Sequence, residues 1–286
     1  MIPIAVCADD YAQNAAISAG ILNLLDQKAL SAASCFSTAP SWREQAAPAL
    51  RERMQAGVDL HRQADIGLHF NLTEGFGGSA AGSLNGWILR GLVGELNRPT
   101  VRTMIATTLQ RQLDAFEQGV GRTPDFIDGH QHVHQFRGVR DLLLDVVAQR
   151  YPQRNSSGQG ATQPWIRNTV RASRAWRGKA QVLERLGGST LANELLRLGY
   201  ASNHGFAGVY GFDRADYGAC FDQWLKAAQP GMLIMCHPAN RVLDSGPPDL
   251  IAAQRVVEHR YFTSSAYTEA LHAAGVQVQR LSDLLP

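Results

Sequence analysis

The sequence predicts an α/β fold built on a parallel sheet of about seven strands, and three observations support this prediction. Short apolar segments rich in strand-forming residues alternate with longer segments whose apolar residues recur at helical spacing. The alternation continues along the chain, as parallel strands joined by helical crossovers require. The composition, 45% apolar and 18% charged over 286 residues, suits one large globular domain or two small ones. Seven strands fit either a barrel or a doubly wound sheet.

The expected elements follow one another in a regular order. The strand segments are short apolar runs, and they span residues 2–8, 31–38, 64–72, 125–130, 164–169, 231–237 and 276–281. The helical segments show the longer apolar period, and they span residues 14–30, 100–120, 138–150, 191–200, 217–229 and 264–275. The clearest of them, residues 100–120, ends before Gly121 and Pro124, which are typical of a helix C-terminus.

Two stretches rich in small polar residues and glycine interrupt the alternation. Residues 74–98 and 152–164 have few periodic apolar positions, so both are expected to be loops. The alternation resumes after each of them, so neither is a linker, and a single domain over residues 1–286 is expected. Long loops in a compact domain often bind ligands or cover a site.

Charge and hydropathy exclude several classes of protein. A net charge of +2 provides no strong field for nucleic acid or a membrane surface. No stretch reaches the roughly 18 to 20 apolar residues of a membrane span, and the N-terminus lacks the basic segment of a signal peptide. A cytoplasmic protein is therefore expected, and a homodimer stays open as its assembly.

The four cysteines form no C-x-x-C pair and no disulfide framework. Cys7, Cys35, Cys220 and Cys236 are expected to be reduced thiols, mostly buried. Cys236 stands beside His237, so a nucleophilic cysteine is the alternative, although the features below favour water as the nucleophile.

Several predicted strands end in a carboxylate or an imidazole. Asp9 and Asp10 follow the first strand, and His69, His130 and His237 stand at the ends of three later ones. Because the C-terminal ends of parallel strands converge, these side chains are expected to meet in one pocket. One aspartate oxygen with two histidine nitrogens is a normal ligand set for a divalent transition metal. Each residue alone has an ordinary explanation, such as helix capping by an aspartate, but their shared position favours a metal site.

The densest histidine cluster lies in FIDGHQHVHQF, residues 126–136. If this stretch is extended, His130 and His134 are ~13 Å apart, too far for all three histidines to share one ion. The first, His130, is therefore expected to bind the metal. His132 and His134 are expected to line the pocket or hold the ligand.

Five motifs in order resemble one known family. They are ADDYAQNAAISAGI, IGLHFNLTEG, PDFIDGHQHVH, FAGVYGF and MCHPA, and together they span nearly the whole chain. This set resembles the YdjC-like carbohydrate deacetylases, which include chito-oligosaccharide and hopanoid-biosynthesis deacetylases. The resemblance implies a single-domain, distorted (β/α) barrel and one divalent metal ion. The family is often described with Mg²⁺, whereas two histidines and one aspartate would suit Zn²⁺, Co²⁺ or Ni²⁺ by ligand softness. The resemblance implies Asp10, His69 and His130 as the metal ligands.

The resemblance also implies roles for the remaining residues. Asp9 matches the general base and His237 matches the general acid, while Arg167 in WIRN matches an arginine near the substrate. One departure is visible, because the family pattern ADDFG is replaced by Asp9-Asp10-Tyr11-Ala12. Alanine in place of glycine disfavours a positive φ at that turn.

The activity implied is removal of an acetyl group from an N-acetylated sugar by metal-activated water. Asp9 would take the proton of the water and His237 would protonate the leaving amine, so the rate is expected to rise and then fall with pH. The partner would be a small N-acetylated saccharide or a glycolipid head group.

Two other classes stay open. One is another metal-dependent amidohydrolase, although there the H-x-H motif ends the first strand; the other is a non-catalytic sugar-binding protein with a residual metal site. Trp87, Trp165 and Trp176 are expected either to stack on sugar or to pack in the core, and His204 has no assigned role.

Overall fold

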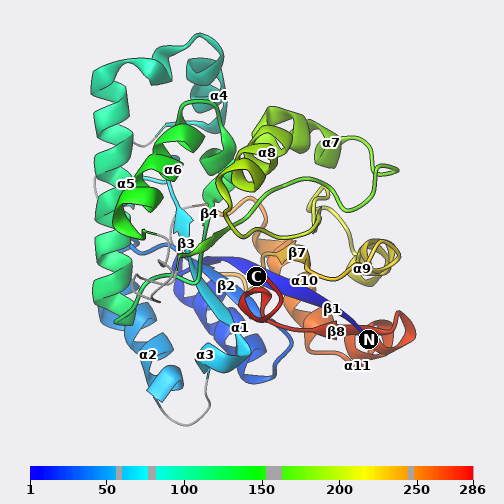
Figure 1. Cartoon of the computed structure of the whole chain (residues 1–286). Coiled ribbons are helices and arrows are strands. Elements are labelled where there is room, and N and C mark those ends of the chain that lie inside the picture. Colours follow the sequence, from blue (N-terminus) through cyan, green and yellow to red (C-terminus); the bar gives the residue numbers. More distant parts are fainter. Residues whose placement is uncertain (56–59, 77–81, 153–162, 244–247, 286) are drawn as a thin grey trace, which may run out of the picture.

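Strand β1 (Ile2–Tyr11) is central to a parallel sheet in the computed structural model, which describes residues 1–55, 60–76, 82–152, 163–243 and 248–285. The strands follow the order β5-β4-β3-β2-β1-β7-β6, and β8 pairs with the beginning of β1 (Figure 1). All of these pairs are parallel. The other strands are β2 (Ala32–Cys35), β3 (Asp65–Phe70), β4 (Phe126–Gly129), β5 (Trp165–Ile166), β6 (Phe206–Ala207), β7 (Met232–Cys236) and β8 (Val276–Val278).

The two ends of this path of strands meet through the segment that follows β5. Arg171 forms an isolated parallel bridge with Phe206 of β6. The backbone N–H of Phe206 donates to Val170, and the N–H of Ala172 donates to Phe206, at 2.8 and 3.1 Å. The sheet therefore curls into an irregular ring. This confirms the predicted distorted (β/α) barrel, with seven strands on the path and β8 in addition.

Alternate residues of each strand face two different apolar cores. In β1, Val6 and Ala8 belong to the larger core, which also contains the helices, whereas Ala5 and Cys7 belong to a smaller core built mostly from strands. Since successive side chains of a strand point to opposite faces, Asp9 continues the inner face. The same alternation places four later residues on the inner face, namely His69, Asp128, Arg167 and His237.

Helices cover the outside of the barrel, and every helix expected from the apolar period is present. They include α1 (Ala15–Asp26), α5 (Pro99–Val120), α6 (Val139–Arg150), α8 (Ser189–Leu198), α9 (Tyr217–Leu225) and α11 (Ser265–Ala273). In Figure 1, α5 and α6 stand side by side along one flank, and α10 and α11 lie on another. None of the helices in the described ranges is long and apolar enough to cross a membrane.

Five α-helices and one strand were not expected from the sequence. They are α2 (Ala47–Gln55), α3 (Leu60–Gln63), α4 (Leu84–Leu92), α7 (Lys179–Leu183), α10 (Ala252–Phe262) and β6. Helix α4 corrects the prediction that residues 74–98 form only a loop; Ser83 caps it by accepting the backbone N–H of Gly86. The second predicted loop, residues 152–164, lies largely outside the described residues. All four cysteines are free, and three are buried, as expected.

The glycine of the IGLHF motif is explained by packing inside the barrel. A Cβ atom at Gly67 would lie 2.5 Å from ring carbons of Phe126. That ring stacks on Trp165, with ring centroids 4.3 Å apart, so it has little room to move. Position 67 must therefore lack a side chain for β3 and β4 to pair as they do.

Replacing Gly67 by alanine should thus destabilise the protein by about 1–3 kcal/mol through overpacking. Gly75→Ala is a matched control, because a Cβ atom added there would meet no neighbouring atom within 4 Å, and it should change stability by less than about 0.5 kcal/mol. Urea unfolding followed by circular dichroism measures both. Equal stability of the two variants would contradict this account of β3 packing.

Candidate metal and acid–base site

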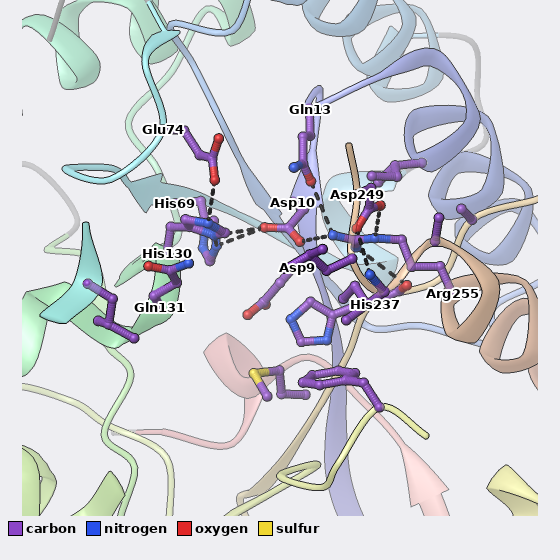
Figure 2. Close-up of a pocket in the computed structure, with 18 of the residues that line it drawn as sticks. Asp9, Asp10, Gln13, His69, Glu74, His130, Gln131, His237, Asp249 and Arg255 are labelled. Atoms are coloured by element: carbon purple, nitrogen blue, oxygen red, sulfur yellow. Dashed lines mark hydrogen bonds and ion pairs between the residues drawn. The ribbon is translucent and has the colours of Figure 1, made fainter. Parts of the chain in front are cut away.

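A cavity of about 910 Å³ opens at the C-terminal ends of the strands. Its walls include all five strand-end residues singled out by the sequence, namely Asp9, Asp10, His69, His130 and His237. Figure 2 shows that Asp10 lies between the two imidazoles on one side and Arg255 on the other. The parallel topology therefore gathers side chains that are up to 228 positions apart in sequence (237 − 9 = 228).

Three donor atoms converge at one point of this cavity. Asp10 Oδ1 lies 3.1 Å from His130 Nδ1 and 3.3 Å from His69 Nε2, and the two nitrogens are 3.3 Å apart. Asp10 Oδ1 is buried and lacks a hydrogen-bond partner within the described ranges. Two imidazole nitrogens and a carboxylate oxygen that face one another form a donor set that fits a divalent cation.

Carboxylates and a guanidinium fix the orientation of these three donors. His69 Nδ1 lies 2.7 Å from Asp128 Oδ1, so its Nε2 is directed at the cluster. Glu74 Oε1 lies 3.4 Å from His130 Nε2 and leaves Nδ1 facing the cluster. Arg255 Nη2 donates to the other oxygen of Asp10 at 2.6 Å. A carboxylate on the far nitrogen of a histidine is the usual support of a metal-binding imidazole.

The electrostatics of the cluster favour positive charge. Burial lowers the pKa of His69, but the negative charge of Asp128 and the carboxylate oxygens of Asp10 and Asp128 beside the ring outweigh it and raise this pKa to about 10. Burial raises the pKa of Asp10, but Arg255 and His130 outweigh it and hold this pKa well below its usual value. The protein alone therefore keeps Asp10 ionised and holds a proton on His69.

The backbone at the end of β1 is strained. Asp10 has φ of +69° and Ala12 has φ of +76°, in the left-handed region that residues with a Cβ atom rarely adopt. The positive φ of Asp10 interrupts the strand alternation, so that it lines the same cavity as its neighbour Asp9. Ala12 thus accepts the conformation that glycine would adopt more readily.

Arg167 lies beneath the cavity rather than in its wall. It is fully buried and donates two hydrogen bonds to Asp9, at 2.7 and 2.8 Å, and its Nη2 lies 2.6 Å from Asp128 Oδ2. The sequence-based interpretation of Arg167 as a substrate-binding residue needs correction, because its side chain has no exposed surface. Instead it holds Asp9 and Asp128 in place.

The HQHVH segment is not extended. Residues His130–Gln135 form a 3₁₀ helix, within which Gln131 and His132 have φ of +51° and +59°. His132 lines the cavity with its ring edge-on to Phe206, as expected of a pocket residue. His134 is buried outside the cavity wall, and its Nε2 lies 2.9 Å from the carbonyl oxygen of Arg167. Its interpretation as a substrate-binding residue is therefore also corrected.

His237 is a buried imidazole held at the end of β7. Its backbone N–H donates to Glu258, and its ring lies edge-on to Phe212. Its Nδ1 lacks a hydrogen-bond partner among the described residues. Burial lowers the pKa of His237 to about 4, although Asp10 and Asp9 act in the opposite direction. The imidazole is therefore neutral near pH 7, which differs from the protonated acid expected from the sequence.

Several residues that support the site were assigned no role from the sequence. Asp128, Glu74 and Arg255 contact its imidazoles or carboxylates, and Glu258 holds the backbone of His237. Only Asp128 had a usable signal, because it lies two residues after inward-facing Phe126 on the same strand. The tryptophans of uncertain role lie away from this cavity: Trp87 and Trp165 are buried in the core, and Trp176 lines a smaller cavity. His204, also unassigned, is exposed.

The chain belongs to the family of YdjC-like proteins, whose model matches residues 3–273. It is 31% identical over 109 residues to proteins of mouse and of human, each named carbohydrate deacetylase. This alignment covers 32% of the chain and 34% and 32% of the two relatives, so the chain spans about a third of the relatives it matches. A protein of Enterococcus faecalis V583, whose name links it to cellobiose-phosphate cleavage, has a similar fold. Its TM-score is 0.63 at 19% identity, with 100% of this chain and 99% of that one covered.

The buried position of Arg167 gives a pH-dependent prediction for stability. Burial raises the pKa of Asp128 and Arg167 lowers it, and the balance holds it below its usual value. The ionised carboxylate therefore contributes stability above about pH 4, which is lost as pH falls through the lowered pKa. In Arg167→Met the Asp128 and Asp9 charges lose this partner, so the variant should lose about 3–5 kcal/mol at pH 7.

The loss should be smaller at pH 5, because protonation then relieves the buried charge. Arg53→Met is the control, since Arg53 pairs with Asp26 at the surface and should cost less than about 1 kcal/mol at either pH. Urea unfolding at the two pH values provides the measurement. A loss for Arg167→Met that is the same at both would argue against buried charge as its cause.

Proposed function

We propose that this protein is a metal-dependent deacetylase that hydrolyses the acetamide group of an N-acetylated sugar. The observation that carries the proposal is the convergence of Asp10 Oδ1, His69 Nε2 and His130 Nδ1 within 3.3 Å of one another, next to Asp9 and His237 in one cavity. The names of the mouse and human relatives support carbohydrate deacetylation as the reaction.

The residues fit a divalent ion held by Asp10, His69 and His130. A buried carboxylate oxygen without a hydrogen-bond donor is costly unless a cation binds there. Two nitrogen donors favour Zn²⁺ over Mg²⁺, which prefers oxygen. When bound, such an ion supplies Lewis acidity for the attacking water and for the acetyl carbonyl group.

Asp9 is assigned the role of general base, which takes a proton from the attacking water. Arg167 holds its carboxylate through both oxygens, so the side chain is fixed without being exposed to bulk water. The acetyl C–N bond breaks, acetate leaves, and the sugar nitrogen gains a proton to become an amine. His237 is assigned to deliver that proton. Because its imidazole is neutral in the free protein, it must take up a proton within the reaction cycle.

Substitution in the donor cluster should remove the metal selectively. His130→Ala takes away one of three donors and should abolish most bound metal after chelation and addition of Zn²⁺ or Mg²⁺. His134→Ala removes a histidine four positions away that lies outside the cavity wall, and it should retain the metal. The test is the number of metal ions per protein molecule, measured on folded variants by inductively coupled plasma mass spectrometry. Equal metal content in both variants would refute the assignment of His130.

Removing either proton-transfer group should reduce acetate release from N-acetylated sugars by about 10²- to 10⁴-fold while the metal stays bound. Asp9→Asn and His237→Ala are the variants. The pH profile of kcat/KM reports the free enzyme, in which His237 has already lost its proton well below pH 6. Deprotonation of His237 should therefore cause no fall in kcat/KM between pH 6 and 8. A fall in that range that His237→Ala abolishes would show that His237 enters the reaction protonated.

A further inference from the structure

The cavity has two chemically different ends. The strand ends supply its carboxylates and imidazoles, whereas much of the remaining wall is aliphatic. The aliphatic part extends to five partly or fully exposed side chains, which we call the apolar rim: Val182, Leu186, Val242, Leu243 and Leu250. They come from two segments far apart in sequence, residues 179–186 around α7 and residues on either side of positions 244–247.

The exposure of the apolar rim calls for an explanation. Leu250 is 97% exposed, Val182 is 55% exposed and Val242 is 49% exposed. Single exposed leucines are ordinary, and Leu196 on α8 is one. Several exposed aliphatic side chains that line one cavity mark a binding surface for an apolar group.

A chain of sugars is a poor match for this wall. Sugar rings are bound by flat aromatic faces and by polar groups that satisfy their hydroxyls. The aromatic rings of the wall are those of Phe76, Phe136, Tyr210 and Phe212, and none of them belongs to the apolar rim. Phe212 lies edge-on to His237 with Tyr210 beside it, and Phe76 packs against Phe36 next to His130, so these rings lie at the polar end. The tryptophans of the described ranges lie outside the wall, and the aliphatic side chains of the rim offer no hydrogen bond. Two cations, Lys179 and Arg241, also line this part, but their long stems add methylene surface to it.

We propose that the substrate is amphiphilic: the acetylated sugar carries an apolar aglycone, such as an alkyl or lipid chain, that lies against the apolar rim. This inference rests on the proposed function, because the cavity that binds the aglycone is continuous with the donor cluster. It narrows the substrate from any N-acetylated saccharide to one attached to a hydrocarbon group. The sugar enters the polar end, and the aglycone removes the exposed leucines and valines from water.

Matched glycosides test the inference in the metal-loaded protein. The methyl and octyl β-glycosides of N-acetylglucosamine share one reacting group and differ only in the length of the hydrocarbon chain. Acetate release should show a kcat/KM at least about 10-fold higher for the octyl glycoside. The difference should come from a lower KM, since each buried methylene adds binding free energy. The octyl glycoside is used below its critical micelle concentration. Equal kcat/KM for the two glycosides would overturn the proposal.

A double variant locates the aglycone. Val182→Ser combined with Leu250→Ser changes one rim residue from each segment and should remove most of the octyl advantage. Leu196→Ser is the matched control, because Leu196 is 83% exposed and lies outside the cavity wall; it should keep the full advantage. An octyl advantage that persists in the double variant would overturn the assignment to the apolar rim.

A binding arm separates this inference from the proposed function. Octyl β-glucoside has no acetamide, and its binding by isothermal titration calorimetry does not depend on turnover. If neither glycoside releases acetate, the deacetylase proposal fails; binding of octyl β-glucoside that the double variant loses would still support the apolar site, and no binding would overturn it. A concentration-dependent dimer that Leu250→Ser dissociates, without any alkyl preference, would assign the rim to a second copy of the chain and overturn the proposal.

Discussion

The buried guanidinium of Arg167 is the constraint on which the rest of the site depends. It lies between Asp9 and Asp128, two carboxylates that could not both stay ionised inside a barrel without a cation between them. Asp128 in turn orients His69, and His69 faces Asp10. A single ion-pair network therefore sets the direction of one donor atom and the position of the proposed base. Its parts come from strands β1, β3 and β4 and from the residue that follows β5, so it forms only when the sheet has curled.

The sequence predicted the barrel and most of the inner face because both follow from the two-residue period of strands. His69 and His237 each follow an apolar strand whose inward positions can be counted, and the parallel order brings their ends together. The two-residue period gives no information about residues whose backbone departs from strand geometry. The positive φ of Asp10 and the 3₁₀ turn at His130 are set by tertiary contacts, and neither leaves a mark in the apolar pattern. Arg255 is one of several arginines on polar helix surfaces, so only the fold shows that it reaches Asp10.

The strain at the end of β1 and the aliphatic wall of the cavity serve different parts of the same site. Left-handed backbone at Asp10 brings two adjacent carboxylates to one cavity, which an ideal strand would not allow. Packing of the surrounding interior, where Ala8 and Tyr11 are fully buried, offsets the backbone strain at Asp10. The barrel thus sets the positions of the carboxylates and imidazoles at the polar end of the cavity. The apolar rim, in contrast, comes from connecting segments outside the sheet, where sequence can change without disturbing the barrel.

The charges of the site explain why the donor cluster would accept a cation and why His237 would stay neutral beside it. In the ion pairs of the site, the buried carboxylates of Asp9, Asp10 and Asp128 oppose the buried guanidiniums of Arg167 and Arg255, which leaves one negative charge (−3 + 2 = −1) when the histidines are neutral. Glu258 is also buried but lies outside these ion pairs, and burial raises its pKa to about 7. Without an ion, a proton on His69 cancels the negative charge of these ion pairs, which is why the pKa of His69 is raised. A divalent cation bound by His69 would displace that proton and change this balance from −1 to +1, so metal and proton would compete for one position. Burial already lowers the pKa of His237 to about 4. A net charge that changed from negative to positive nearby would lower this pKa further. The imidazole of His237 would therefore be neutral in a metal-loaded site as well as in the free protein.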